Sequence, residues 1–248
     1  MASRAPDDHP AALIFHGMTG TPDEVRDVVE LFNDKGFLTI VPRLSGHGVS
    51  LDELKRTRAS AWLVDAERAL AQAKPQSQRV VTVGQSFGAL LSLYIALTAP
   101  AQVRGAVLLS PPIRFRSKQR ELLLATLSYL PDAILDRLGT VAKQARPDAQ
   151  FRRPRDAFDR HSLGAAARLV QIRRNVMRRL SELRCPLLVL QDPQDHHLSP
   201  ELPAVLRTFG RKVDIRHSWI SGGLHELALG PRCQEVLEKI NQFVDEVC

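Results

Sequence analysis

A serine between two glycines is the side chain of this sequence best placed for nucleophilic chemistry. The segment 84–88, GQSFG, follows an apolar, β-branched run at 80–83 and precedes small and apolar residues with the character of a helix. This G-x-S-x-G pattern is typical of a sharp, strained strand-to-helix turn, where neighbouring backbone leaves no room for a Cβ beside the serine. The spacing therefore predicts that Ser86 is a nucleophile held at the tip of such a turn.

A serine nucleophile needs a histidine to accept its proton and a carboxylate to hold that histidine in the right tautomer. His225 lies in a glycine-containing loop between the last predicted strand and the final predicted helix, and Asp195 follows the apolar run at 186–190. The expected chain order on this architecture is Ser, acid, His, which both residues satisfy. Asp192 is the alternative acid, although its position also suits a turn-forming aspartate.

The neighbouring residues His196 and His197 are the alternatives to His225 as the base. Together with Asp192 and Asp195 they could suggest a metal site, but no third region supplies convincing ligands, so no metal is expected. The other histidines are predicted to be structural or exposed, or to lie in a loose terminus. These are His9, His16 and His47, with His161 in a helix of the inserted segment and His217 in a strand.

Acyl transfer at a serine also requires two backbone N–H groups that bind the developing oxyanion. One comes from the residue after the nucleophile and the other from the loop after the first strand. Phe87 and Met18 occupy these positions. Because the donors are main-chain groups, the side chains can be apolar and help to exclude water. None of these steps needs a cofactor, and none is expected.

Short apolar runs alternate with helical patterns along most of the chain. The predicted strands lie at 11–15, 37–41, 80–83, 105–109, 186–190 and 213–220. The predicted helices lie at 21–36, where Thr21 is the cap and Glu24 stands in the first turn, at 60–73, directly after 88, and at 235–247. This alternation implies βαβ units and a mostly parallel, doubly wound α/β sheet.

The segment 111–184 interrupts this alternation between two predicted core strands. It is rich in arginine and mostly helical in pattern, which predicts a helical cap inserted before the acid-bearing strand. We therefore expect one domain over 1–248, with a core formed by 1–110 and 185–248. The apolar stretch 122–135 within the cap suggests an acyl pocket for a short or medium chain.

The positive charge of the chain is concentrated in this cap. The net charge is +7, and the segment 113–184 alone holds 17 Lys or Arg residues against 7 Asp or Glu residues. Such a surface could attract an anionic substrate, an anionic lipid or an acidic protein partner, or could consist only of solvated helix faces. The aromatic residues of the segment are few and irregularly spaced, and no recognition motif is present, so nucleic-acid binding is not expected.

Length and composition are those of a globular protein. A chain of 248 residues with 44% hydrophobic content can bury a sizeable core. No apolar run reaches the length of a membrane span and the start has no apolar core, so a cytoplasmic protein without integral membrane association is expected. The cysteines Cys185, Cys233 and Cys248 are widely spaced and odd in number, which favours free thiols.

Several segments together resemble the α/β-hydrolase family, and within it the small bacterial carboxylesterases and monoacylglycerol lipases. They are HGMTGT at 16–21, GHG at 46–48, GQSFG at 84–88, DHHLSP at 195–200 and GLHEL at 223–227. The acid loop of this family has its aspartate, aliphatic residue and proline spaced as they are in 195–200, which favours Asp195 over Asp192. Asp192 stands where such relatives usually carry glycine, and the basic cap is unlike the caps of the family.

The resemblance implies a serine hydrolase that cleaves carboxylic esters, such as monoacylglycerols, through an acyl-enzyme intermediate, with the cap determining the substrate. One alternative is a thioesterase or acyltransferase acting on acyl-CoA or carrier-protein thioesters that dock on the basic cap. Another is a non-catalytic ligand-binding protein that keeps the hydrolase fold and its pocket.

Overall fold

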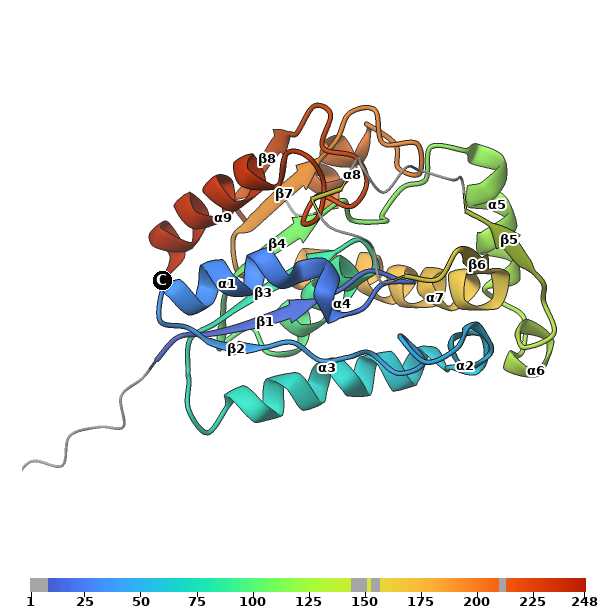
Figure 1. The fold of residues 1–248 in the computed structure, drawn as a ribbon, viewed down its shortest axis with the longest axis horizontal. Coiled ribbons are helices and arrows are strands. Elements are labelled where there is room, and N and C mark those ends of the chain that lie inside the picture. The colour runs from blue at the N-terminus through green and yellow to red at the C-terminus, as the bar shows by residue number, and fades with distance from the viewer. Residues whose placement is uncertain (1–8, 144–150, 153–156, 210–212) are drawn as a thin grey trace, which may run out of the picture.

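A six-stranded parallel sheet forms the centre of the molecule, with strand order β2-β1-β3-β4-β7-β8 (Figure 1). The computed structural model describes residues 9–143, 151–152, 157–209 and 213–248. The strands of this sheet are β1 (Ala11–Phe15), β2 (Leu38–Ile40), β3 (Val80–Gln85), β4 (Val103–Leu109), β7 (Leu187–Gln191) and β8 (Ile215–Trp219). The prediction of a doubly wound α/β sheet is confirmed.

Helices cover both faces of the sheet (Figure 1). They are α1 (Arg26–Asp34), α3 (Ala59–Ala73), α4 (Phe87–Thr98), α8 (Leu202–Phe209) and α9 (Cys233–Val247), whereas the short helix α2 (Leu51–Arg56) lies beside the cap. Because successive side chains of a strand point to opposite faces, β1 contributes to two apolar clusters. Leu13 and Phe15 pack in the cluster that contains α3 and α4, whereas Ala12 and Ile14 pack in the cluster that contains α1 and α9.

The structure differs from the predicted elements mainly in short helices. The predicted helix at 21–36 begins as a 3₁₀ turn (Pro22–Val25) and becomes α-helical only in α1. The helices α2 and α8 were not predicted. In α2 Leu54 is the buried side chain, and so short a segment does not show a helical repeat of apolar residues.

The cap over the carboxyl edge of the sheet is not purely helical. It contains α5 (Lys118–Leu127), α6 (Asp132–Leu135) and α7 (Leu163–Arg179), followed by a 3₁₀ turn (Leu180–Glu182). The short strands β5 (Thr140–Ala142) and β6 (Arg160–Ser162) pair antiparallel between α6 and α7. Three-residue strands are too short to show the alternation that identifies a strand in a sequence. Buried residues of α7 belong to the same apolar cluster as α3 and α4, so this helix packs on the core.

Part of the positive charge of the cap stabilises the cap itself. The fully buried Arg168 of α7 pairs with Asp132 at 2.8 Å and with Asp136 at 2.6 Å, and it donates to the Lys55 carbonyl at 2.5 Å. Asp132 and Asp136 lie at the two ends of α6 and Lys55 lies in α2, so Arg168 joins α7, α6 and α2. The alternative of solvated, Arg-rich helix faces therefore does not apply to this arginine.

No helix of the described residues has the length and apolar character needed to cross a bilayer. The three cysteines are free thiols; Cys185 and Cys233 are buried and Cys248 is exposed.

Candidate active site

Ser86 occupies the turn between β3 and α4 in a conformation that L-residues rarely adopt, with φ 53° and ψ −114°. The flanking glycines allow this turn. A Cβ on Gly84 would lie 2.1 Å from the Gly88 carbonyl, and a Cβ on Gly88 would lie 2.2 Å from the Phe15 oxygen. The Ser86 N–H donates to the Leu109 carbonyl at 2.7 Å, which holds the turn against β4. The two glycines of the G-x-S-x-G pattern are thus required by backbone packing.

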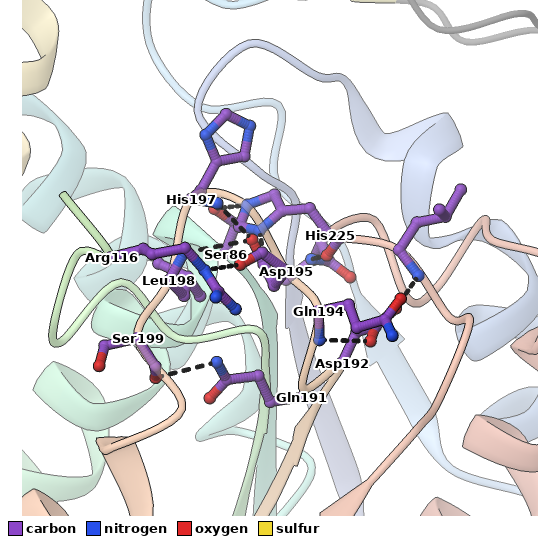
Figure 2. Close-up of polar contacts among 12 residues, drawn as sticks. Ser86, Arg116, Gln191, Asp192, Gln194, Asp195, His197, Leu198, Ser199 and His225 are labelled. Carbon is purple, nitrogen blue, oxygen red and sulfur yellow. Dashed lines mark hydrogen bonds and ion pairs between the residues drawn. The ribbon is translucent and has the colours of Figure 1, made fainter.

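Three side chains from separate segments meet at the carboxyl edge of the sheet (Figure 2). His225 Nε2 lies 2.9 Å from Ser86 Oγ, and His225 Nδ1 lies 2.6 Å from Asp195 Oδ2. Ser86 follows β3, Asp195 follows β7 and His225 follows β8, and the carboxyl ends of parallel strands share one edge. This geometry matches a nucleophile, a base and an orienting carboxylate.

The charge state of this group follows from its surroundings. Burial alone lowers the pKa of His225, but the Asp195 carboxylate opposes this effect and the net pKa is raised above 6.5. Burial alone raises the pKa of Asp195, but the facing His225 and the His197 N–H hold it well below its usual range. Asp195 is therefore ionised at neutral pH. When His225 is neutral, its Nδ1 carries the proton toward Asp195 and its Nε2 is free to accept the proton of Ser86.

Asp192 has a different position from Asp195. Its Oδ1 accepts the Gln194 N–H at 2.8 Å, and its Oδ2 accepts the Leu224 N–H at 2.9 Å (Figure 2). Leu224 has φ 66° and directly precedes His225. Asp192 therefore ties the loop after β7 to the loop that carries His225, and its carboxylate is committed to backbone donors.

Gln85, the residue before Ser86, is also bound to the loop of His225. Its Nε2 donates to the His225 carbonyl at 2.8 Å, and its Oε1 accepts the Ala228 N–H at 3.2 Å. Sequence reasoning assigned no role to this side chain. The available signal was an amide at the end of a mostly apolar strand, all of which is buried.

Five of the other seven histidines fall into two groups. His16 and His47 are buried and order the loops after β1 and β2, as predicted. The Leu44 N–H donates to His16 Nε2 at 3.2 Å, so the His16 proton lies on Nδ1 and is donated to the Gly17 carbonyl at 3.0 Å. Burial, with repulsion from His47, lowers the pKa of His16 to about 3 and keeps it neutral.

The second group lies around the reacting residues. The His197 ring is 5.0 Å from the His225 ring, 4.9 Å from the His196 ring and 6.0 Å from the His161 ring. The prediction that His161 lies in a helix is wrong, since it belongs to β6 and lines the pocket over Ser86. Among the described residues, no group of three or more His, Cys, Asp or Glu side chains could hold a metal ion.

Met18 and Phe87, the predicted oxyanion donors, both lie close to Ser86 in the structure. Phe87 is the first residue of α4, where a backbone N–H has no acceptor within the helix. Met18 lies in the loop after β1 and lines the pocket next to Ser86. The role of both residues in binding an oxyanion remains a prediction.

Glu24 supports the loop that carries Met18. Its Oε2 accepts the Gly17 N–H at 2.5 Å, and a Cβ on either Gly17 or Gly20 would lie 2.9 Å from this oxygen. Sequence reasoning placed Glu24 only in the first turn of a helix. Its contact with Gly17 requires the loop to fold back over the turn, which is not apparent in the local sequence.

We expect the free energy of unfolding of Glu24→Gln, measured relative to wild type, to be more favourable at high pH than at low pH. Burial, with repulsion from Glu226, raises the pKa of Glu24 from 4.5 to about 7, although the Gly17 N–H opposes this shift. Between these values the folded state binds a proton that the unfolded state has released, so the free energy of unfolding falls as pH rises. Glutamine keeps an acceptor for the Gly17 N–H but does not ionise. The free energy of unfolding of the variant should therefore not show this decline.

Urea unfolding of both proteins at about pH 5 and about pH 8 measures this difference, because subtracting wild type from variant cancels the other titrating groups. The variant should gain stability relative to wild type on going to the higher pH. A difference that is the same at both pH values would contradict the prediction.

The pocket over Ser86 has an apolar wall formed mainly by the cap and the loops below it. Its apolar lining residues are Met18, Pro112, Phe115, Leu124, Val141, Leu163, Ala166, Leu169 and Leu198. Of the apolar stretch 122–135, Leu124 lines the pocket, whereas Leu122 and Leu123 are 70% and 51% exposed. The stretch therefore supplies less of the pocket than its composition suggested, and residues from several distant segments supply the rest.

Comparisons with known proteins agree with this architecture. Residues 7–231 match the family model described as serine aminopeptidase, S33. The chain is 26% identical over 188 residues to the thermostable monoacylglycerol lipase of Bacillus sp. (strain H-257), covering 76% of this chain and 71% of the lipase. It is 21% identical over 239 residues to a carboxylesterase of Bacillus subtilis (strain 168), covering 96% of this chain and 93% of the esterase.

Solved structures show the same fold. A structure described for the metagenome-derived lipolytic enzymes LipS and LipT has a TM-score of 0.83 at 22% identity, covering 96% of this chain and 94% of that chain. The monoacylglycerol lipase of Paleococcus ferrophilus has a TM-score of 0.77 at 18% identity, covering 97% of each chain.

Proposed function

The chain belongs to the serine aminopeptidase S33 family of α/β-hydrolases, and we propose that it cleaves carboxylic esters with short or medium acyl chains, such as monoacylglycerols. Together with its lipase and carboxylesterase relatives, this membership identifies a carboxylic ester hydrolase. The proposal that it cleaves esters with short or medium acyl chains rests on the hydrogen-bonded residues Ser86, His225 and Asp195, which lie beneath a mainly apolar pocket. Residues 1–110 and 185–248 form the catalytic core in this proposal, and 111–184 form its cap.

The first half of the reaction forms an acyl-enzyme. Ser86 Oγ attacks the ester carbonyl carbon while His225 Nε2 accepts the hydroxyl proton. Asp195 stabilises the resulting imidazolium, and the Met18 and Phe87 N–H groups bind the oxyanion. When the tetrahedral intermediate collapses, the ester C–O bond breaks and His225 returns the proton to the departing alcohol.

The second half releases the acid. A water molecule loses a proton to His225 Nε2 and its oxygen attacks the acyl carbon, which forms a second oxyanion at the same N–H groups. The bond from the acyl carbon to Ser86 Oγ then breaks, and His225 donates its proton to the serine. The products are one carboxylic acid and one alcohol, and the enzyme regains its starting protonation.

We expect p-nitrophenyl esters from acetate to dodecanoate to be hydrolysed with a maximum of kcat/KM at a short or medium acyl chain. The apolar lining provides favourable contacts that increase with each methylene group until the pocket is filled. Initial rates of p-nitrophenolate release measure this profile. A failure to hydrolyse any ester of the series would contradict ester hydrolysis, and a maximum at dodecanoate would contradict the proposed chain length.

A further inference from the structure

The pocket over Ser86 also has a polar section, which the proposed ester hydrolysis does not use. Its members come from α5, from the segment after β5, from β6 and from the loops after β7 and β8. They are Arg120, Lys143, His161, His196, His197 and Glu226. These groups make no favourable polar contact with an apolar acyl chain. Their position in the pocket wall therefore suggests that they bind a polar part of the substrate.

Arg120 and His197 form a pair whose protonation is determined by geometry. Arg120 Nη1 lies 3.2 Å from His197 Nδ1. A guanidinium only donates hydrogen bonds, so His197 Nδ1 is the acceptor and its proton lies on Nε2. Burial and the nearby His225 lower the pKa of His197 and keep this ring neutral. The pair therefore carries one positive charge, which belongs to Arg120.

The other arginines near this section are already matched by acceptors. Arg116 donates to the carbonyls of Asp195 and Pro193 at 2.7 and 2.8 Å. Arg173 pairs at 2.5 Å with Glu121, the residue that follows Arg120 in α5. The nearest acidic residue in sequence is therefore not available to Arg120.

Lys143 lies in a different electrostatic setting. Lys143, Glu24 and Glu226 together line a small recess beside the pocket, to which neither Arg120 nor His197 contributes. Among the described residues no carboxylate lies within ion-pair distance of Arg120. Within the part of the chain that the structure describes, Arg120 is thus a cation of the pocket wall without an acidic partner.

We propose that Arg120 binds a carboxylate carried by the ester substrate, with the Nε2–H of His197 as a second donor. One N–H of the guanidinium is used by His197, and the rest of its planar fork matches the two oxygens of a carboxylate. Because the His197 ring lies 5.0 Å from the His225 ring, the bound carboxylate is close to the reacting ester. The substrate class is thus a monoester of a dicarboxylic acid or a similar anionic ester. This inference rests on the proposed ester hydrolysis.

A matched pair of substrates tests the inference. The mono-p-nitrophenyl ester of adipic acid and p-nitrophenyl hexanoate have acyl chains of equal length and differ in a terminal carboxylate. The measured quantity is kcat/KM for the adipate ester divided by kcat/KM for the hexanoate ester, determined separately for each protein. This ratio cancels any loss of folded enzyme. We expect Arg120→Gln to lower the ratio roughly 10- to 100-fold, mainly through KM for the adipate ester, because a charge-assisted hydrogen bond is lost.

Two further variants separate carboxylate binding at Arg120 from a long-range effect of the positive charge of the protein. Lys118→Gln removes the same charge from an exposed position of α5 that is outside the pocket, and the ratio should stay within about 2-fold of wild type. Arg120→Lys keeps the charge but not the planar fork, and should retain an intermediate ratio.

The outcomes distinguish the two proposals. If wild type hydrolyses hexanoate and Arg120→Gln leaves the ratio unchanged, the carboxylate site is wrong while ester hydrolysis stands. An equal fall of the ratio in Lys118→Gln would also overturn the site, because long-range charge would then explain the preference. If wild type hydrolyses neither ester, the proposed function itself fails.

Discussion

The substitution Ser86→Ala is expected to reduce kcat/KM for p-nitrophenyl esters by about 10⁴- to 10⁶-fold. Alanine lacks the hydroxyl that forms the acyl-enzyme, so the remaining rate would come only from substrate binding and oxyanion stabilisation. Ser86 Oγ lies 2.9 Å from His225 Nε2, and its backbone is held in a strained turn that alanine can share with a similar strain. The variant should therefore fold normally and fail in the chemical step.

Ser92→Ala is the matched control. Ser92 lies in α4 near Ser86, and its buried Oγ has no hydrogen-bond partner among the residues that the structure describes, so removal of this hydroxyl should leave activity and folding nearly unchanged. A fluorophosphonate should label wild type and Ser92→Ala in equal amounts and should not label Ser86→Ala. Full activity or stoichiometric labelling of Ser86→Ala would show that another residue is the nucleophile.

The substitution Asp195→Asn is expected to lower kcat by about 10³- to 10⁴-fold while KM changes little. The Asp195 carboxylate fixes the proton of His225 on Nδ1 and stabilises the imidazolium that forms during catalysis. An asparagine amide can instead donate to Nδ1, which places the imidazole proton on Nε2 and prevents proton transfer from Ser86. Steady-state kinetics with the best p-nitrophenyl ester measure this loss.

Asp192→Asn distinguishes the two aspartates. Asp192 accepts the backbone N–H groups of Gln194 and Leu224, and an asparagine oxygen can still accept one of them. We expect this variant to lose less than about 10-fold in kcat, because it loosens the loop of His225 without changing its tautomer. A loss in Asp192→Asn as large as that in Asp195→Asn would contradict the assignment of the acid.

The pH dependence gives a second readout of Asp195→Asn. In wild type the carboxylate overcomes the effect of burial and raises the pKa of His225, so activity falls as pH decreases through this raised value. Without the carboxylate, burial is the largest remaining effect and lowers the pKa of His225 against the smaller opposing effects of Glu226 and Glu24. The acid limb of the residual kcat/KM should therefore move to lower pH, and a shift to higher pH would contradict this account.

The sequence by itself determined the parallel α/β sheet and the segments that carry the site. The buried strands of a parallel sheet are continuous apolar runs, which remain visible in a single sequence. The turn around Ser86 was equally predictable, because Gly84 and Gly88 are required by backbone atoms only a few residues away or in the adjacent strand. The order of Ser86, Asp195 and His225 along the chain also indicated which strand ends had to meet.

The tertiary structure alone decided which groups surround those residues. The contact of Glu24 with Gly17, the contact of Gln85 with the loop of His225, and the contact of Arg120 with His197 each join segments that fold together only in three dimensions. Local periodicity reports which face of a helix or strand is buried. It does not report the direction of a polar side chain in a loop or the register at which a cap meets a core, because both depend on packing between residues far apart in the chain.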